Sequence, residues 1–238
     1  PGKVYAHLYP NFQNPLTRTY QIRFRAFSGE TCIDEQVRDI TLNATPLVQF
    51  NPIPDTCLNI APFQIVQASE VGGVPGSFVF SGPGVNAAGV FDPSSVGPGT
   101  YSILYTYTSN RGCIDSARRS IRILQPPVAN FGFSLPACET KTITFTDSSS
   151  VPASAGVLVT WTWDFGDGTP LVIRTNNSAF THTYAAAGAY LVKLFVTTAG
   201  GCNSLYKEKW VNVKPQPLAN FSFTDTACLP NARIQFRN

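Results

Sequence analysis

The stretch WTWDFGDGT at residues 161–169 decides the fold, together with HTY at 182–184 and GAYLVKLFV at 188–196. In the last of these, apolar side chains recur at every second position, which is the period of a half-buried β-strand. The tryptophans of the first stretch alternate in the same way. The sequence therefore predicts strand, turn and strand of an antiparallel β-structure.

Trp161, Trp163 and Phe165 fall on one face of the first strand, so we expect them in a core. The turn that follows is marked by two kinds of residue. We expect the carboxylates of Asp164 and Asp167 to accept hydrogen bonds from turn amides, and the glycines between and after them, Gly166 and Gly168, to permit positive φ.

The landmarks around this stretch recur along the chain, which indicates a tandem array. A tyrosine precedes a cysteine by 12 residues three times, at Tyr20/Cys32, Tyr101/Cys113 and Tyr190/Cys202. A phenylalanine precedes a cysteine by seven residues three times, at Phe50/Cys57, Phe131/Cys138 and Phe221/Cys228.

Proline clusters near residues 46, 126–127 and 215–217 separate the repeats, because proline stiffens its neighbours and lacks an amide donor. We predict four modules: the C-terminal part of one at 1–45, complete modules at 46–126 and 127–216, and the N-terminal part of another at 217–238. The absence of Met, at position 1 as elsewhere, indicates that the chain is a processed product or an internal piece of a longer protein.

Alternating runs begin at Tyr20, Tyr101 and Tyr190, and shorter ones include Ile40/Leu42, Ile121/Ile123, Ile143/Phe145 and Val211/Val213. About seven short strands per module, with frequent turns, is typical of a β-sandwich. We predict an all-β fold of tandem immunoglobulin-like antiparallel β-sandwiches in an extended array.

Composition excludes several classes of partner. Charged residues make up 13% of the 238-residue chain and the net charge is +3, without a basic block. Nucleic acid is therefore not an expected partner. No apolar run is long enough to span a bilayer, so we expect no membrane insertion of this segment.

Each complete module has two cysteines, one toward its start and one toward its end, and each partial module has one. If the complete modules are independent, Cys57 pairs with Cys113 and Cys138 with Cys202, while Cys32 and Cys228 have their partners outside this chain. Free thiols are one alternative, and pairing across the linkers (Cys32–Cys57, Cys113–Cys138, Cys202–Cys228) is another. Disulfides indicate an oxidising, extracellular compartment.

The third module resembles the polycystic-kidney-disease (PKD) repeat. The resemblance covers nearly all of 127–216 and rests on Trp163-Asp164-Phe165-Gly166-Asp167-Gly168, His182-Thr-Tyr184 and Gly188-Ala-Tyr190. It implies the same sandwich. The first module keeps His7-Leu-Tyr9 and Tyr20, and it resembles the back half of another PKD repeat with a longer spacing.

The second module lacks Asp-Phe-Gly-Asp-Gly and has Gly82-Pro-Gly84-Val, Phe91-Asp-Pro and Gly112-Cys113 instead. It resembles the immunoglobulin-like repeats that alternate with PKD repeats in long Bacteroidota surface proteins, including gliding-motility adhesins exported by type IX secretion.

We expect no enzyme activity and no cofactor. The two histidines, His7 and His182, occupy equivalent repeat positions, which favours a structural role, and no nucleophile, zinc or phosphate motif is present. A calcium site on Asp164 and Asp167 is the alternative to a purely structural turn, because paired carboxylates suit a hard cation, although the ligand set is incomplete.

The leading hypothesis is a non-enzymatic stalk or filament segment of a long bacterial cell-surface adhesin, used for gliding or surface attachment. Its partners would be neighbouring modules of the same polypeptide. The alternative is an accessory module of a secreted hydrolase that binds an extracellular glycan or protein surface, with Trp210 as the stacking platform.

Asp115-Ser116-Ala and Asp225-Thr226-Ala resemble the acceptor of Bacteroidota O-glycosylation, which makes Ser116 and Thr226 candidate glycosylation sites.

Overall fold

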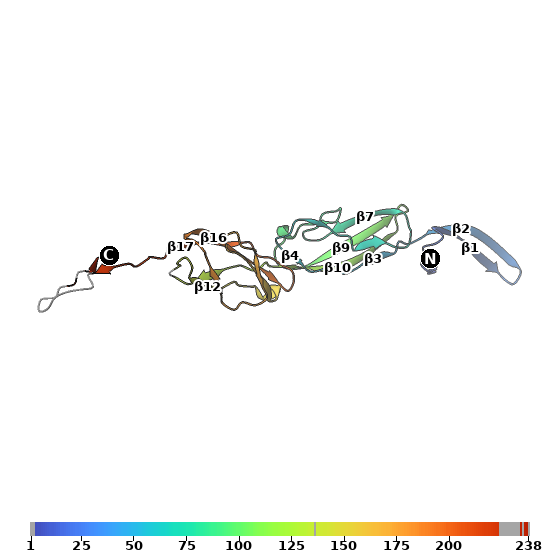
Figure 1. Ribbon diagram of the computed structural model, residues 1–238. Coiled ribbons are helices and arrows are strands. Elements are labelled where there is room, and N and C mark those ends of the chain that lie inside the picture. Colours follow the sequence, from blue (N-terminus) through green and yellow to red (C-terminus); the bar gives the residue numbers. More distant parts are fainter. Residues whose placement is uncertain (1–2, 136, 224–233, 235, 238) are drawn as a thin grey trace. The chain divides into compact units, whose positions relative to one another are not determined.

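The computed structural model describes residues 3–135, 137–223, 234 and 236–237. The chain divides into two units, Pro1–Pro126 and Pro127–Asn238 (Figure 1). The described residues form β-strands, connected by turns and by two 3-10 helices of three residues each. The fold is all-β, as predicted, with two sandwiches in tandem whose strands pair antiparallel except for one short parallel pair in the first. The division into four modules stays a prediction.

The first unit begins with a long hairpin. Strands β1 (Thr17–Ser28) and β2 (Cys32–Asn43) pair antiparallel along their whole length, from Thr17↔Asn43 to Ser28↔Cys32. Large apolar side chains remain exposed on it, including Phe24, Phe27 and Ile33. Alternation therefore predicts this strand pair correctly but not its burial, because no second sheet covers it within the described residues.

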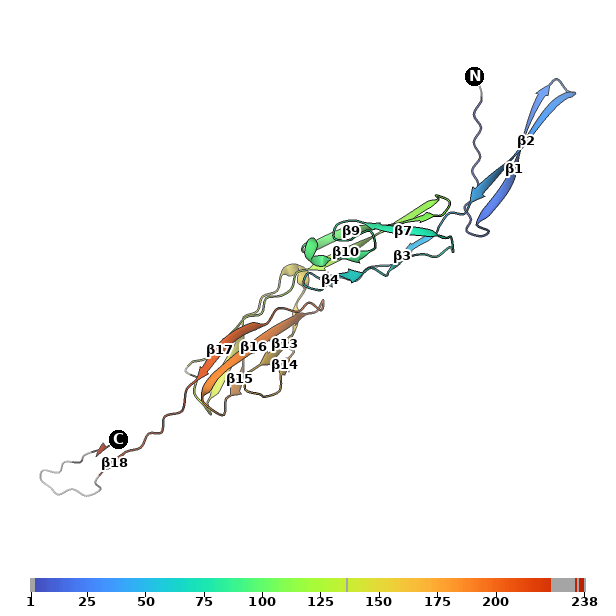
Figure 2. The same cartoon turned by 90° about the horizontal axis from the view of Figure 1, so that it is seen from above.

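The first sandwich occupies the rest of this unit. Its main sheet has the order β4-β10-β9-β7, and two further pairs, β3-β6 and β5-β8, complete it (Figures 1 and 2). The elements are β3 (Val48–Phe50), β4 (Thr56–Cys57), β5 (Phe63–Gln64), β6 (Ala68–Glu70), β7 (Gly76–Ser81), β8 (Val90–Phe91), η1 (Pro93–Ser95), β9 (Gly99–Ser109) and β10 (Ile114–Leu124).

Alternate positions of the long strands fill the core of this sandwich. Ile103 and Tyr105 of β9 and Ile121 and Ile123 of β10 are buried together. They pack with five residues from the shorter elements: Phe50, Ile53, Ile65, Phe80 and Phe91.

The second sandwich has one sheet of order β11-β12-β15 and another of order β14-β13-β16-β17. Its elements are β11 (Phe131–Phe133), β12 (Thr142–Asp147), η2 (Ala153–Ala155), β13 (Leu158–Asp164), β14 (Val172–Arg174), β15 (Phe180–Thr183), β16 (Gly188–Thr198) and β17 (Lys207–Val213). A last antiparallel pair, β18 (Ser222–Phe223) with β19 (Phe236–Arg237), follows it in the chain.

Aromatic side chains dominate the second core. Trp163 and Phe165 are each 1% exposed and Trp161 is 6% exposed, which confirms their predicted position. Val192, Leu194 and Val196 come from β16 at every second residue, and they meet Phe131 and Phe145 of the opposite sheet.

Each sandwich receives the chain at one end, its proximal end, and releases it at the other, its distal end. In the first sandwich Val48, near the start, donates its amide to Asp115 Oδ2 at 2.8 Å, at the beginning of β10. The chain leaves this sandwich after Leu124, at the end of the same strand. In the second sandwich Val128 bridges Ser150 at the proximal end, and Lys214 bridges Cys138 at the distal end.

The predicted disulfides Cys57–Cys113 and Cys138–Cys202 are wrong, because Cys113 and Cys138 are free thiols. Cys57 pairs with Leu124 at the end of β10, whereas Cys113 precedes the start of that strand. At about 3.3 Å per residue the two are ~35 Å apart, far beyond the roughly 4.4–6.8 Å between the Cα atoms of a disulfide.

The second sandwich repeats this separation. Cys138 forms a β-bridge with Lys214 at the distal end. The Cys202 amide is hydrogen-bonded to Thr198 at the other end of the sandwich, where β16 ends. Cys57 and Cys202 are each disulfide-bonded. Cys32 is free, so the alternative pairs Cys32–Cys57 and Cys113–Cys138 are also not formed. Cys228 lies outside the described residues.

No helix in the described part of the chain is both long and apolar enough to cross a membrane.

Candidate functional site: the aspartate-glycine turn and its sheet face

The turn of residues 165–169 follows β13 directly, and its path depends on Gly166. This residue has φ +71°, and a Cβ there would lie 2.6 Å from the backbone oxygen of Leu191 on β16. Only glycine combines this conformation with so close an approach to a neighbouring strand. The turn is therefore packed tightly against β16.

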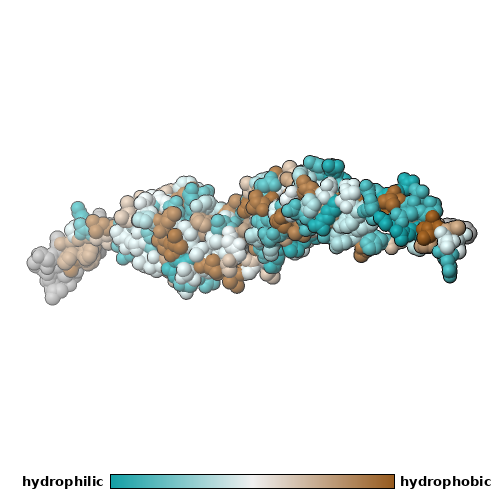
Figure 3. Space-filling model, turned by 90° about the vertical axis from the view of Figure 1, so that its right-hand side faces the viewer, coloured by the Kyte–Doolittle hydropathy of each residue, from teal (hydrophilic) through white to brown (hydrophobic). Residues whose placement is uncertain are grey.

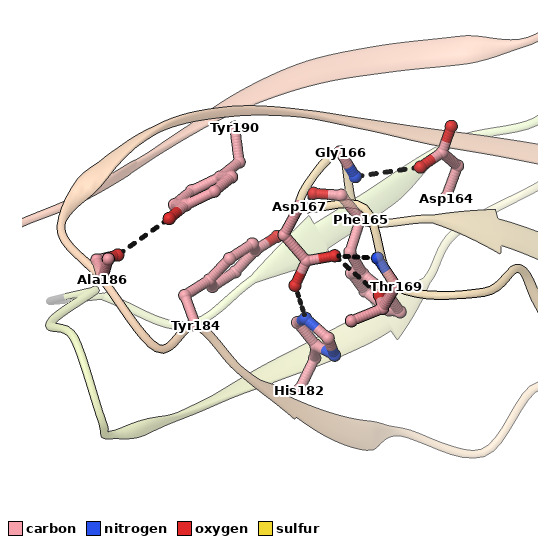
Figure 4. Close-up of polar contacts among 9 residues, drawn as sticks. All are labelled: Asp164, Phe165, Gly166, Asp167, Thr169, His182, Tyr184, Ala186 and Tyr190. Carbon is pink, nitrogen blue, oxygen red and sulfur yellow. Dashed lines mark hydrogen bonds and ion pairs between the residues drawn. The ribbon is translucent and has the colours of Figure 1, made fainter.

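The two aspartates act as hydrogen-bond acceptors within the turn, as the sequence predicts (Figure 4). The Gly166 amide donates to Asp164 Oδ1 at 2.9 Å. Asp167 Oδ1 accepts from the amide of Thr169 at 3.1 Å and from its hydroxyl at 2.6 Å. Each carboxylate thus closes a short Asx-type turn.

A contact that the sequence did not predict joins this turn to β15. His182 Nε2 lies 2.7 Å from Asp167 Oδ2, and Figure 4 shows the two side chains facing each other. The imidazole stacks on the Phe165 ring at a centroid distance of 3.9 Å. Asp167 and His182 are 15 residues apart, and they follow or lie on strands of different sheets, β13 and β15, so the packing of one sheet on the other brings them together.

The environment of Asp167 lowers the pKa of its carboxyl. Burial alone would raise it, but hydrogen bonds from Thr169 and His182 outweigh burial, so the pKa lies below its ordinary value. These bonds favour the ionised form of the acid.

Two tyrosines complete the cluster. Tyr184 is fully buried, and its hydroxyl donates to the Phe165 carbonyl at 3.2 Å. Its ring stacks on Tyr190 at 4.2 Å, and the Tyr190 hydroxyl donates to the Ala186 carbonyl at 2.9 Å. Burial, followed by the charge of Asp167, raises the pKa of Tyr184 well above its ordinary value. This phenol therefore stays protonated at physiological pH.

The cluster lacks the parts of a catalytic triad. In a catalytic triad the histidine contacts a nucleophile through one ring nitrogen and an orienting acid through the other. Among the described residues, His182 is hydrogen-bonded to Asp167 and to no hydroxyl or thiol. The one buried phenol beside it donates to a backbone carbonyl. The arrangement holds a turn in place.

The calcium alternative at Asp164 and Asp167 stays a prediction, and the structure shows what these carboxylates bind instead. Both oxygens of Asp167 already accept hydrogen bonds, from Thr169 and from His182, and those donors occupy the places of a cation. No group of three or more His, Cys, Asp or Glu side chains with metal-binding geometry occurs in the described ranges.

The first unit contains a smaller version of the same aromatic group. His7 and Tyr9 meet edge to face at 4.5 Å, and Tyr9 packs on Tyr20 at 4.8 Å. His182 and Tyr184 also meet edge to face, at 4.8 Å. The equivalence of the two histidines is thus visible in the structure.

The outer face of β16 and β17 carries the exposed aromatics. Trp210 is 60% exposed and lies opposite Leu191, while Val211 and Val213 point into the core, as predicted. On the same sheet, Phe195 and Tyr206 pack at 5.1 Å. Figure 3 shows brown, hydrophobic groups scattered among white and teal ones over the face in view.

A shallow hollow of about 200 Å³ lies beside this aromatic pair. Lys193 at its edge pairs with Glu208 at 3.3 Å. The residues that line it are Thr162, Asp164, Leu171, Lys193 and Tyr206. Polar and aromatic groups therefore meet on this face.

The candidate glycosylation sites differ in what the structure describes. Ser116 is exposed on β10, and its amide hydrogen-bonds to Asp115 Oδ1. Thr226 lies outside the described residues. Glycosylation of either stays a prediction.

The sandwich of the second unit, with its aspartate-glycine turn locked by a histidine, agrees with one family model. Residues 124–213 match the PKD domain. PKD domains are non-catalytic, typically extracellular modules with structural or binding roles, and they also occur in secreted proteases.

Comparison with known proteins gives further matches to PKD domains. A 46-residue segment, 19% of the chain, is 48% identical to human polycystin-1 and spans 1% of that protein's length. The PKD1 domain of Vibrio anguillarum Epp is 28% identical over 39% of this chain and 99% of its own, with a TM-score of 0.33.

The PKD1 domain of the Vibrio cholerae metalloprotease PrtV is also 28% identical, over 37% of this chain and 98% of its own, with a TM-score of 0.32. Fibronectin(III)-like modules of Clostridium thermocellum CbhA are 12% identical over 72% of this chain and 95% of their own, with a TM-score of 0.39.

Proposed function

We propose that this chain is a spacer segment of a long extracellular protein, a stalk whose modules hold a distant part away from its point of attachment. The observation that carries the proposal is the position of the two chain ends in each sandwich. In the first, Val48 lies beside Asp115 and the chain leaves after Leu124, nine residues further along β10. That separation is ~30 Å at about 3.3 Å per residue.

A module that receives and releases the chain at opposite ends adds its own length to an array. The second sandwich is built in the same way, with Val128 at one end and Lys214 at the other. Short proline-containing links at 126–127 and 215–217 favour stiff connections over free hinges. Length is then the property on which function depends.

The polar groups of the aspartate-glycine turn support a role without catalysis. Asp164, Asp167 and Tyr184 are all bonded to groups of their own module. These hydrogen bonds hold the shape of the turn, and they support a structural role for the module.

We extend the proposal to the parent protein, which we take to be a cell-surface adhesin of the Bacteroidota type, exported by type IX secretion and used in gliding or attachment. The support is the Gly82-Pro-Gly84-Val and Phe91-Asp-Pro pattern of the first sandwich beside a PKD domain. The flanking sequence tests this: further alternating repeats are expected, and an adjoining catalytic domain would contradict it.

Small-angle X-ray scattering of residues 1–238 tests the spacer. A single globule of this length has a radius of gyration of ~18 Å. We expect a value well above that, and a distance distribution with a long tail. A radius near ~18 Å would overturn the proposal.

The exposed aromatic face favours a second candidate function, an accessory module that binds an insoluble glycan. Trp210 offers a flat apolar surface on which a sugar ring can stack. Retention of the chain on insoluble polysaccharide, lost in Trp210→Ala and kept in Ile173→Ala, would support this function. Ile173 is the matched control because it is 67% exposed on β14 of the same sheet.

A further inference from the structure

Each complete sandwich carries one cysteine at its distal end and one at its proximal end, in two recurring local structures. At the distal end, the residue after the cysteine donates its amide to the last strand: Leu58 to the Leu124 carbonyl and Glu139 to the Lys214 carbonyl, both at 2.9 Å. Cys57 and Cys138 are therefore equivalent in structure as well as in spacing.

The proximal cysteines are equivalent too. The amide of Cys113 donates to Ser109 Oγ at 3.0 Å, and that of Cys202 donates to Thr198 Oγ1 at 3.1 Å. In return, the amides of Ser109 and Thr198 donate to the carbonyls of Cys113 and Cys202. The same closed turn holds both thiols.

The oxidation states nevertheless differ between equivalent positions. Cys57 and Cys202 are disulfide-bonded, whereas Cys138 and Cys113 are free. Cys57 is 7% exposed and Cys202 is 0% exposed, whereas the free thiols of Cys113 and Cys138 are partly exposed. Because each local structure accommodates a disulfide in one copy, the free copy differs by what lies beside it.

What lies beside Cys113 is an open groove of about 360 Å³ within the first unit. Its other lining residues come from the segment before the β1–β2 hairpin, residues 9–12, and from the base of the hairpin, including Leu42, Asn43 and Thr45. Asn43 follows Tyr20 by 23 residues, as Leu124 follows Tyr101. Leu124 is the residue that pairs with Cys57, so the place beside Asn43 is where the distal cysteine of the first module belongs.

We propose that Cys113 forms a disulfide with the distal cysteine of the first module, on a strand that precedes residue 1 and fills this groove. The hairpin indicates independently that the first module has further strands, because Phe24, Phe27 and Ile33 toward its tip are between 57% and 64% exposed and no second sheet of the described residues covers them. Cys138 forms the corresponding bond with the proximal cysteine of the module that begins at 217, beyond residue 238.

The bond forms by oxidation of two thiols. Each gives up its proton, and the two electrons pass to the disulfide of a thiol–disulfide oxidoreductase, which leaves as the dithiol. Cys113 and Cys138 are partly exposed in the chain of residues 1–238, so the oxidant can reach each of them.

The test uses the whole polypeptide from which this chain comes, alkylated without reduction, digested and analysed by mass spectrometry. We expect the Cys113 peptide to be linked to a peptide from before residue 1, and the Cys138 peptide to one from beyond residue 238. Alkylated Cys113 or Cys138, or a link of either to any cysteine of residues 1–238, overturns the proposal.

Free-thiol counting with Cys113→Ser gives an independent answer. If Cys113 is bonded, the substitution releases its partner and the count rises by one. If Cys113 is free in the whole polypeptide, the count falls by one. Ser116→Ala, an exposed substitution three residues away, is the control and should leave the count unchanged.

Discussion

Asp167 is the residue that makes the most hydrogen bonds in the aspartate-glycine turn of the second unit. Its two oxygens bind Thr169 on one side and His182 on the other, so one carboxylate joins the turn to a strand of the opposite sheet. Phe165 stacks on the imidazole that this carboxylate contacts. Loss of this charge should be felt in stability.

We expect Asp167→Asn to lower the free energy of unfolding of the second unit by about 1–3 kcal/mol at neutral pH, since a hydrogen bond to a charged group is lost. The lowered pKa of Asp167 decides how its contribution to the free energy of unfolding changes with pH. The ionised carboxylate stabilises the fold above the unfolded-state pKa of ~3.9, and this stabilisation is lost as pH falls through the lower folded-state pKa.

Urea unfolding between pH 7 and pH 2, followed by tryptophan fluorescence, measures this. The difference in free energy of unfolding between wild type and Asp167→Asn should become smaller below pH ~4. Asp164→Asn is the control, because asparagine keeps the oxygen that accepts from Gly166. A gap that is constant over the whole range would show that the charge of Asp167 does not contribute.

Trp163 is the largest fully buried side chain. Trp163→Ala should destabilise the second unit by about 3–5 kcal/mol, through lost burial and the cavity left between Phe131 and Phe165. Trp210→Ala removes the same side chain from an exposed position and should change stability by less than about 0.5 kcal/mol. Thermal unfolding of the two variants compares them directly, and equal losses would contradict the core position.

At the scale of elements, the sandwich is fixed by a long strand whose first tyrosine bonds back to the preceding turn. Tyr101 donates to the Val96 carbonyl at 2.6 Å, and Tyr190 donates to the Ala186 carbonyl at 2.9 Å. Both hydroxyls anchor the corner before the strand, as the tyrosine corner of immunoglobulin-like folds does. This explains why tyrosine recurs at the start of β9 and β16.

Two glycines of one turn separate backbone strain from steric clash. Gly166 and Gly168 both have positive φ, at +71° and +83°, but a Cβ has open space at Gly168 and meets the Leu191 backbone at Gly166. Gly168→Ala should cost about 1–2 kcal/mol of strain. Gly166→Ala should cost clearly more in the same urea titration, and equal costs would show that β16 yields.

The long strands could be predicted from the sequence and the short ones could not. β9 and β16 have 11 residues each, enough for alternation to show. β4, β5 and β8 have two residues each, too few for a period, and their pairing depends on distant partners. The aspartate turn was predictable because its acceptors and donors are neighbours in sequence.

The Asp167–His182 contact and the disulfides could not be predicted from the sequence. Both depend on which end of a strand meets which, and spacing alone does not carry that information. Equal offsets place the cysteines at recurring positions along the sequence. They did not show that Cys57 lies at the end of β10 and Cys113 before its start.

At the scale of the whole molecule, the two sandwiches have separate cores. The buried cluster around Phe91 and Ile103 belongs to the first unit, and the one around Trp163 belongs to the second. The chain has three tryptophans, Trp161, Trp163 and Trp210, and all of them lie in the second unit. Tryptophan fluorescence therefore reports on one unit only.

We expect unfolding in two steps, because each core can be lost without the other. Circular dichroism should show both transitions and tryptophan fluorescence one of them. Trp163→Ala should shift the fluorescence transition to lower urea and leave the other in place. Coincident transitions by both probes, shifted together by the substitution, would show instead that the units unfold as one.

The opposite placement of the two chain ends in each sandwich also bears on how such a protein can evolve. Duplication or deletion of one whole repeat in the gene leaves every remaining fold intact and changes reach by a fixed increment of ~30 Å. Natural variants that differ in repeat number would then differ in the distance they bridge while keeping the same surface chemistry.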